Sequence, residues 1–378
     1  MEKRQRFLPV SFFLFSTLVV LFACPAIGAA DDHHPVIPTT ARTKRDAREH
    51  HRHNGRVKLF VFGDSYVDTG NFEPNNGSWL PPFGRTFPGV PSGRFSDGRV
   101  LTDYIADFLG IRTPIAYQQI KAGDGGEQLK SGVNFAYGGT GVVSAISKGP
   151  VLGDQISQLG QMIRHRFYNQ TDLDNSVALV AASGNDYKYA TLKNVTALTR
   201  KLIKQQKTDL RRIHDELRIP KIAVLLMEPA GCLPHSAGPS AMHSSKCNEA
   251  HNAIVSNHNQ LLKQAVHDLN KETTTNNNKK KKNGGTFVIL DLFQAFSNAL
   301  EEHKYHTGSL RYKNPLKPCV TLARGKWPCG LGNDNGGGVR VCKHPELAFF
   351  WDCNHPSQNG WNEVYLALQH SLYQLYDA

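Results

Sequence analysis

The sequence predicts an α/β protein with a parallel sheet, because short apolar runs alternate with longer helix-like stretches. Runs rich in Val, Ile, Leu or Phe without polar alternation are typical of strands covered on both faces, and they span Val57–Phe62, Val177–Ala182, Ile222–Met227 and Phe287–Leu292. The helix-like stretches are Leu101–Leu109, Gln155–Tyr168, Val195–Leu217 and Asn248–Leu269. Functional sites in such sheets collect beyond the carboxyl ends of the strands.

The N-terminal region divides into two segments that precede the folded part. An apolar stretch, Phe7–Ala23, follows three basic residues and leads into small residues at 26–30, an order typical of a secretory signal rather than a spanning helix. We therefore expect residues 1–30 to be a signal peptide, 31–56 a disordered segment and 57–378 a single folded domain. Within that domain, the Lys/Asn-rich stretch 273–285 is expected to be a flexible surface loop.

The net charge of +12 does not indicate a nucleic-acid-binding protein, because the charge is concentrated outside the predicted core. Residues 1–30 and 31–56 contribute +2 each and Lys279–Lys282 contribute +4. No basic stripe interleaved with aromatic residues remains. The apolar share of 40% is enough for a core and excludes a wholly disordered chain. We expect no stable membrane anchor, and the oligomeric state stays open.

The cysteines fit an exported protein. Cys24 lies in the predicted signal, and the other cysteines form an even set that allows up to three disulfides: Cys232, Cys247, Cys319, Cys329, Cys342 and Cys353. Sequence proximity favours Cys232 with Cys247. A zinc site is the alternative, but no CxxC pair occurs, so we expect no metal. Candidate N-glycosylation sequons begin at Asn76, Asn169 and Asn194.

Two of the apolar runs end in residues suited to catalysis. Gly63-Asp64-Ser65 follows the first run, where Ser65 is placed to be a nucleophile if a base lies nearby, although it could instead cap a helix. Gly184-Asn185-Asp186 follows the second run, where the Asn185 amide could face developing negative charge, although the triplet is also ordinary turn chemistry.

Two further segments carry chemistry that suits a serine nucleophile. Asp352 and His355 lie three residues apart, so that one turn can bring the carboxylate against the imidazole. A capping Asp beside a surface His is the alternative. The glycine-rich segment 134–141 would let backbone N–H groups approach a substrate oxygen closely, or would simply form a turn.

Together these segments resemble the plant branch of the GDSL esterase/lipase family, within the SGNH hydrolases. The matching blocks are Gly63-Asp64-Ser65 with Asp68-Thr69-Gly70-Asn71, Asn134-Phe135-Ala136 before Gly138-Gly139, Gly184-Asn185-Asp186, and Asp352-Cys353-Asn354-His355-Pro356. The segments 84–88 and 93–99 also resemble plant members. The resemblance spans Lys58 to Leu368.

The resemblance implies a three-layer α/β/α sandwich of the flavodoxin-like type and a serine hydrolase acting on esters. It makes Ser65 the nucleophile, His355 the base and Asp352 the residue that orients the base. The oxyanion would be bound by the backbone N–H groups of Ser65 and Gly139 and by the side chain of Asn185. It implies no cofactor and no metal.

The chain departs from the family at its cysteines. Cys353 stands where plant members often have a small residue, and Cys329 lies in Pro328-Cys329-Gly330 where they often have adjacent cysteines. From the resemblance we expect Cys353 to bond with Cys319, which leaves Cys329 for Cys342.

The resulting hypothesis is a secreted serine esterase or lipase, exported to the extracellular space (the apoplast in a plant). Its activity is expected to fall below about pH 6, because the base must be neutral. An acyltransferase with the same acyl-enzyme, and a non-catalytic binding protein on the same fold, are the alternatives. The partner is expected to be an ester of a small molecule, a lipid or a carbohydrate; which of these it is, and its acyl-chain length, stay open. The stretch Phe72–Pro91 is expected to line the approach to the site.

Overall fold

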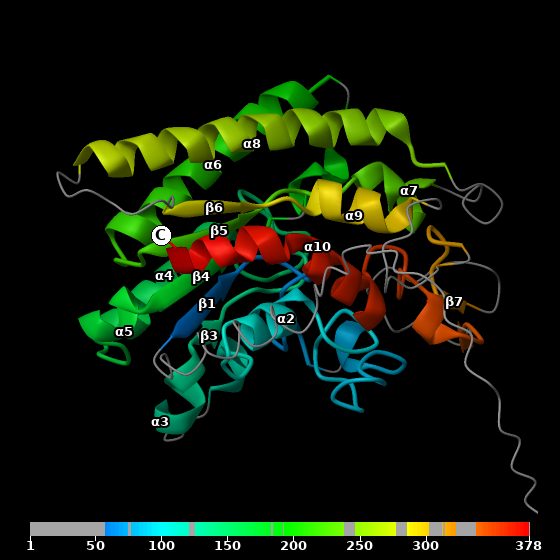
Figure 1. Cartoon of the computed structure of the whole chain (residues 1–378). Coiled ribbons are helices and arrows are strands. Elements are labelled where there is room, and N and C mark those ends of the chain that lie inside the picture. Colours follow the sequence, from blue (N-terminus) through cyan, green and yellow to red (C-terminus); the bar gives the residue numbers. More distant parts are fainter. Residues whose placement is uncertain are drawn as a thin grey trace, which may run out of the picture. The chain divides into compact units, whose positions relative to one another are not determined.

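The computed structural model describes residues 57–74, 77–120, 125–182, 184–191, 193–237, 246–276, 286–301, 312, 314–322 and 338–377. The predicted signal peptide and N-terminal segment lie outside these residues, and the division of the chain into those segments and one domain stays a prediction. The described residues form a parallel sheet flanked by helices (Figure 1). An additional two-stranded sheet lies near the C-terminal part of the chain.

The main sheet has six strands in the order β2-β3-β1-β4-β5-β6, and all the pairings are parallel. Its strands are β1 Lys58–Phe62, β2 Ile115–Ala116, β3 Val133–Asn134, β4 Ser176–Val180, β5 Lys221–Leu225 and β6 Phe287–Leu290. The four predicted strands are therefore confirmed as β1, β4, β5 and β6. The second sheet is the antiparallel pair of β7 (Val320–Leu322) and β8 (Val339–Val341).

Helices cover both faces of the main sheet. The α-helices are α2 Leu101–Phe108, α3 Gly125–Gln128, α4 Leu152–Arg164, α5 Gln170–Asp174, α6 Val195–Asp215, α7 Pro234–Ala237, α8 Glu249–Asn276, α9 Leu292–Leu300 and α10 Gln358–Asp377. Short 3₁₀ helices are η2 Gly77–Trp79, η3 Tyr117–Gln119, η4 Leu129–Ser131, η5 Asn185–Tyr189, η6 Ala230–Cys232 and η8 Pro345–Leu347.

The core is divided by the sheet into two apolar clusters. In β1, Leu59 and Val61 pack with α2, α9 and α10, whereas Phe60 and Phe62 pack on the opposite face with α4, α6 and α8. Because successive strand residues point to opposite faces, burial on both faces requires an uninterrupted apolar run, as the sequence has. The predicted three-layer α/β/α architecture is therefore confirmed.

The predicted loop at 273–285 begins too early. Helix α8 continues to Asn276, and the hydroxyls of Thr273 and Thr274 both donate to the backbone carbonyl of Asn270. These threonines satisfy their hydroxyls on the preceding turn, so the polar composition does not end the helix. Residues 277–285 lie outside the described part of the chain.

The carboxyl ends of three adjacent strands lie level with one another. Val61 of β1 pairs with Asn134 at the end of β3, and Phe62 pairs with Val180 at the end of β4. The chain runs from β3 on one side of β1 to β4 on its other side, which is the kind of switch point where ligands bind in open α/β sheets. Among the described residues, no helix combines the length and apolar character that a bilayer crossing needs.

Candidate active site

Ser65 lies on a tight turn directly after β1. Gly63 leaves the strand with φ +145°, and a Cβ built on it would lie 2.2 Å from the carbonyl oxygen of Ala181, so a side chain is excluded there. The backbone N–H groups of Val67 and Asp68 donate to the carbonyl of Asp64 at 3.1 and 3.0 Å, which closes the turn around Ser65. The turn leaves Ser65 partly exposed at the edge of the sheet.

The structure brings Ser65, His355 and Asp352 together. His355 Nε2 lies 2.9 Å from Ser65 Oγ, and His355 Nδ1 lies 2.8 Å from both carboxylate oxygens of Asp352. Asp352 is fully buried, and it also accepts the backbone N–H groups of Asn354 and His355 at 2.8 and 2.7 Å. This arrangement lets the imidazole take a proton from the serine hydroxyl while the carboxylate holds the ring.

The residues predicted to bind an oxyanion lie at the ends of the neighbouring strands. Gly139 follows β3 with φ +84°, and Asn185 begins η5 after β4. The Asn185 side-chain amide donates one hydrogen bond to the carbonyl of Thr140 at 2.8 Å, which fixes the amide beside the Gly139 loop. Among the described residues, the backbone N–H groups of Ser65 and Gly139 donate to no protein acceptor. The three groups are thus available as donors to a substrate oxygen.

Asp186 fastens the Gly139 loop to η5. Its carboxylate accepts the backbone N–H groups of Val142, Val143 and Ser144 at 2.7, 3.1 and 3.0 Å. The residue therefore explains why an aspartate follows Asn185 in the third block: it orders the loop that carries Gly139.

Asp68 joins the same loop to the turn of residues 63–68, which carries Ser65, the predicted nucleophile, and is called the nucleophile turn below. The fully buried carboxylate accepts the backbone N–H groups of Gly70, Asn71 and Phe72, and across the site it accepts that of Gly138 at 2.9 Å. Burial raises the pKa of Asp68 to about 7, and these backbone donors act in the opposite direction. The carboxylate thus ties Gly138, which precedes the candidate oxyanion glycine, to the turn that carries Ser65.

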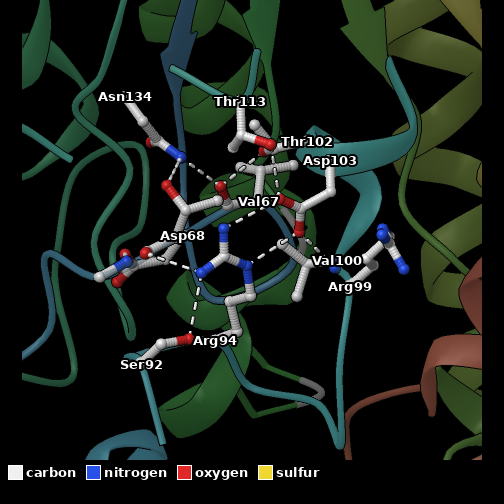
Figure 2. Close-up of polar contacts among 12 residues, drawn as sticks. Val67, Asp68, Ser92, Arg94, Arg99, Val100, Thr102, Asp103, Thr113 and Asn134 are labelled. Atoms are coloured by element: carbon white, nitrogen blue, oxygen red, sulfur yellow. Dashed lines mark hydrogen bonds and ion pairs between the residues drawn. The ribbon is translucent and has the colours of Figure 1, made fainter. Parts of the chain in front are cut away.

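Two asparagines complete the support of the nucleophile turn. The Asn71 amide donates to the carbonyls of Asn134 and Ala136, both at 2.8 Å. The Asn134 amide donates in turn to the Val67 carbonyl at 2.7 Å and to the Thr69 hydroxyl at 2.9 Å. Figure 2 shows Asn134 reaching the turn from one side.

The segment 93–99, identified by family resemblance alone, braces the turn from the other side (Figure 2). Arg94 forms a two-pronged ion pair with Asp103 of α2, with both N···O distances at 2.9 Å. Asp103 also accepts the backbone N–H of Val100, the residue before α2, at 2.9 Å. From the same helix, the Thr102 hydroxyl donates to the Val67 carbonyl at 2.6 Å. This network attaches α2 to the turn that follows Ser65.

Sequence reasoning missed Gln155, a fully buried residue of α4. The side-chain oxygen of Gln155 accepts the Gly63 backbone N–H at 2.7 Å. Its side-chain N–H₂ group donates to the Gly63 backbone carbonyl at 2.9 Å and to the Thr140 hydroxyl at 3.0 Å. Gln155 therefore links the nucleophile turn to the loop after Gly139. A single glutamine on an amphipathic helix gives no sequence signal of such a role.

An aromatic cluster packs against the imidazole. The Phe95 ring lies 4.9 Å from the His355 ring, centroid to centroid, at an interplanar angle of 32°. Phe72, Phe83 and Tyr137 pack in turn around Phe95 or its neighbours. Phe72 and Phe83 belong to the stretch predicted to line the approach, and both are buried. They act as the packing behind Phe95.

The disulfide pattern differs from the prediction. Cys232 is bonded to Cys247, as sequence proximity favoured, but Cys319 is bonded to Cys342 rather than to Cys353. The antiparallel pairing of Val320 with Val341 explains this, because it places the preceding and following cysteines side by side with a Cα–Cα distance of 4.8 Å. The pairing of Cys329 with Cys342 is therefore also wrong.

Cys353 is itself disulfide-bonded, and Cys329 lies outside the described residues. The segment that carries Asp352 is thus covalently tethered, as expected, although through other pairings. It is also held by β7, since Cys319 and Val320 donate their backbone N–H groups to the carbonyls of Phe350 and Trp351 at 3.0 and 2.8 Å.

Two of the sequon asparagines lie at exposed helix starts. Asn169 precedes α5 and Asn194 precedes α6, and both are exposed, whereas Asn76 lies outside the described residues. The Asn169 side-chain oxygen accepts the Asp172 N–H and that of Asn194 accepts the Thr191 N–H. Glycosylation at these positions stays a prediction. Within the described part of the chain, no group of three or more His, Cys, Asp or Glu side chains is arranged to hold a metal ion.

Comparison with known proteins identifies the family. The model of the GDSL-like lipase/acylhydrolase family matches residues 59–368. The chain is 42% identical to the GDSL esterase/lipase At5g03610 of Arabidopsis thaliana over 86% of this chain and 89% of that protein. It is 38% identical to the Arabidopsis GDSL esterase/lipase At3g09930 over 96% of this chain and 97% of that protein.

The chain therefore belongs to the GDSL esterase/lipase family, with its plant members among its relatives. This membership confirms the resemblance inferred from the sequence blocks. Within that class, the chain is a hydrolase of carboxylic esters, so its substrates are ester compounds.

Proposed function

We propose that the chain is a secreted serine esterase that cleaves esters through a covalent acyl-enzyme on Ser65. The observation that supports this most directly is the hydrogen-bonded series from Asp352 through His355 to Ser65, with the hydroxyl 2.9 Å from the imidazole. A serine hydroxyl attacks poorly without a base in this position.

In the first half of the reaction, Ser65 Oγ attacks the ester carbonyl carbon and its proton passes to His355 Nε2. The resulting oxyanion is bound by the N–H groups of Ser65 and Gly139 and by the Asn185 amide. The C–O bond to the alcohol then breaks, and His355 gives its proton to the departing alcohol. Asp352 stabilises the imidazolium throughout and holds the ring.

In the second half, His355 removes a proton from a water molecule, whose oxygen attacks the acyl carbon of the Ser65 ester. The tetrahedral intermediate collapses, the bond to Ser65 Oγ breaks, and His355 returns the proton to Oγ. The free acid leaves and the enzyme is regenerated. An alcohol in place of water would give acyl transfer, so product analysis with and without an added alcohol distinguishes the two outcomes.

The decisive test is covalent labelling with a fluorophosphonate probe. Wild type is expected to be labelled and to hydrolyse p-nitrophenyl esters, and Ser65→Ala is expected to lose both properties. His355→Ala should lose at least about 10³-fold in rate. Equal labelling of wild type and Ser65→Ala would exclude Ser65 as the labelled nucleophile, whereas no labelling of wild type would favour the non-catalytic alternative.

Export is supported by the basic, apolar and small-residue order of residues 1–30 and by two described disulfides, which persist in oxidising compartments. Expression in plant cells followed by N-terminal sequencing of the protein in the medium tests it. A mature N-terminus after the 26–30 segment is expected, and retention of Met1 would contradict cleavage.

A further inference from the structure

Behind the catalytic pair, Tyr66 joins the nucleophile turn to the turn that carries His355. The buried Tyr66 hydroxyl donates to the backbone carbonyl of Asn354 at 3.0 Å. Its ring lies 6.0 Å from the His355 ring in an edge-on arrangement and 5.0 Å from Trp361 of α10. One side chain, adjacent to Ser65 in the sequence, thus fixes the backbone between Asp352 and His355.

A second buried group faces the same hydroxyl from the end of β5. Glu228 is 1% exposed, its carboxyl interacts with the Tyr66 hydroxyl, and its Oε2 has no hydrogen-bond partner among the described residues. The proposed reaction does not use this carboxyl. A buried carboxylate without full hydrogen bonding is costly, which favours the neutral acid.

The surrounding charges favour the neutral acid further. The charges that act on Tyr66 and Glu228 are carboxylates: Asp64 acts on both groups, and Asp352 acts on Tyr66. The other titratable groups facing this region are His355, against the Tyr66 ring, and His235 of α7, which interacts with Asn354. Burial, with a contribution from Asp64, raises the pKa of Glu228 to about 8.

The protonation state of Glu228 matters because the Tyr66 hydroxyl has a limited number of protons. The hydroxyl has one proton to donate, and in the structure that proton serves the Asn354 carbonyl. A protonated Glu228 can donate to the tyrosine oxygen and leaves this bond intact. An ionised Glu228 can only accept, and a charged acceptor competes strongly for the single proton.

We propose that Glu228 is a positioning residue that must stay protonated so that the Tyr66 hydroxyl holds the Asn354 carbonyl and, through it, the turn of Asp352 and His355. This inference rests on the proposed function. Ionisation of Glu228 turns the tyrosine proton away from Asn354, which loosens the turn that aims His355 at Ser65. The enzyme therefore has an upper pH limit, in addition to the lower limit that its base imposes.

The experiment measures the rate of fluorophosphonate labelling of Ser65 from pH 6 to pH 10 in the full-length mature protein. Wild type is expected to lose rate above about pH 8, by up to about tenfold per pH unit, as for a single ionisation. Glu228→Gln keeps a donor but cannot ionise, so its rate is expected to change less than about twofold over the same range. Tyr66→Phe lacks the hydroxyl and is expected to react more slowly at every pH, without the step near pH 8.

Asp209→Asn is the matched control, because Asp209 of α6 is also a buried carboxyl whose pKa is raised by burial, yet it contacts Arg212 and Gln205 rather than the site. Its pH profile is expected to follow that of wild type. Circular dichroism at each pH separates loss of labelling from loss of fold.

Thermal unfolding gives a second readout that needs no catalysis. Glu228 in the unfolded chain ionises near the ordinary value of 4.5, whereas in the fold it ionises at about 8, so folding is penalised increasingly as pH rises between these values. Glu228→Gln lacks this penalty, and its Tm relative to wild type is expected to increase from pH 5 to pH 8.

Two outcomes would overturn the inference, and they are distinguishable. Labelling of wild type and Glu228→Gln with the same alkaline fall would remove the role of Glu228 and leave the esterase intact. No labelling of wild type at any pH would overturn the proposed function, and the positioning role with it.

Discussion

The side chains of the candidate site are held in place by specific hydrogen bonds. The Asn185 amide is held by the Thr140 carbonyl at 2.8 Å, so its second N–H has a defined direction. Preorganised donors of this kind stabilise developing charge without rearrangement during the reaction. The same principle applies to the Gly139 N–H, whose position depends on a backbone conformation that favours glycine.

Asn185→Ala is expected to lower kcat by roughly 10²–10³ with a small change in KM, because it removes a donor that binds the oxyanion more strongly than the ground-state carbonyl. Steady-state hydrolysis of a p-nitrophenyl ester measures both constants. Asn359→Ala is the control, since it also removes an amide bound to a backbone carbonyl, at Glu346, but on the exposed start of α10. A kcat within twofold of wild type would argue against an oxyanion role for Asn185.

At the scale of elements, the site is assembled from loops that follow adjacent strands and is fastened by helices behind them. Helix α4 contributes Gln155, α2 contributes Thr102 and Asp103, and the β7–β8 pair holds the segment before His355. The helices thus hold the loops of the candidate site in addition to covering the sheet.

Gln155→Leu is expected to lower both kcat and Tm, because the buried N–H of Gly63 loses its partner at a cost of about 1–3 kcal/mol, while the Gly63 carbonyl keeps only the hydrogen bond from the Tyr137 N–H. Gln161→Leu lies on the same helix with an exposed side chain and serves as the matched control. Kinetics and thermal unfolding of the two variants test the expectation. Comparable behaviour of both would show that α4 does not control the site.

Removing the Cys319–Cys342 disulfide with a double Ser substitution is expected to destabilise the fold by roughly 3 kcal/mol and to lower kcat, because β7 hydrogen-bonds the backbone at Phe350 and Trp351. The equivalent double substitution of Cys232 and Cys247 is the comparison, as that disulfide closes a loop between η6 and α8. Denaturant unfolding and esterase assays measure the effects. An unchanged kcat in the first variant would contradict the coupling of β7 to the site.

For the molecule as a whole, stability should depend on pH through a buried histidine that lies outside the site. His258 of α8 is 2% exposed, and its Nδ1 lies 2.9 Å from the Tyr187 hydroxyl of η5. Burial lowers the pKa of His258 to about 4.

Because the unfolded chain protonates this histidine near its ordinary value of 6.5 while the folded chain does not, stability is lost as pH falls from about 6.5 to about 4, by on the order of 3 kcal/mol. His258→Gln is expected to show a smaller fall in Tm over this range than wild type, and the exposed His344→Gln the same fall as wild type. Parallel Tm curves for His258→Gln and wild type would contradict the assignment.

Much of the fold could be predicted from the sequence because β1, β4, β5 and β6 are buried on both faces and therefore carry uninterrupted apolar runs. The two-residue strands β2 and β3 are too short for any periodicity to indicate. The run predicted to end at Leu292 stops earlier, because Asp291 caps α9 by accepting the Gln294 N–H at 3.0 Å. That capping signal was present in the sequence and outweighs the apolar pattern.

At the site, the residues in sequence motifs could be predicted from the sequence, whereas the residues that hold them in place could not. Ser65, Asp352 and His355 lie within recognisable blocks. The contacts of Gln155 and Tyr66, at about 3 Å, and the burial of Glu228 arise only in the folded chain. The pairing of Cys319 with Cys342 depends likewise on the β7–β8 register, which the sequence did not indicate.

The hydrogen bond between Ser65 and His355 joins residues 290 positions apart. A nascent chain that has been synthesised through Ser65 contains the proposed nucleophile, yet it has no base beside this serine until the distant His355 has been synthesised and docked. A chain that ends before His355 is therefore expected to lack esterase activity.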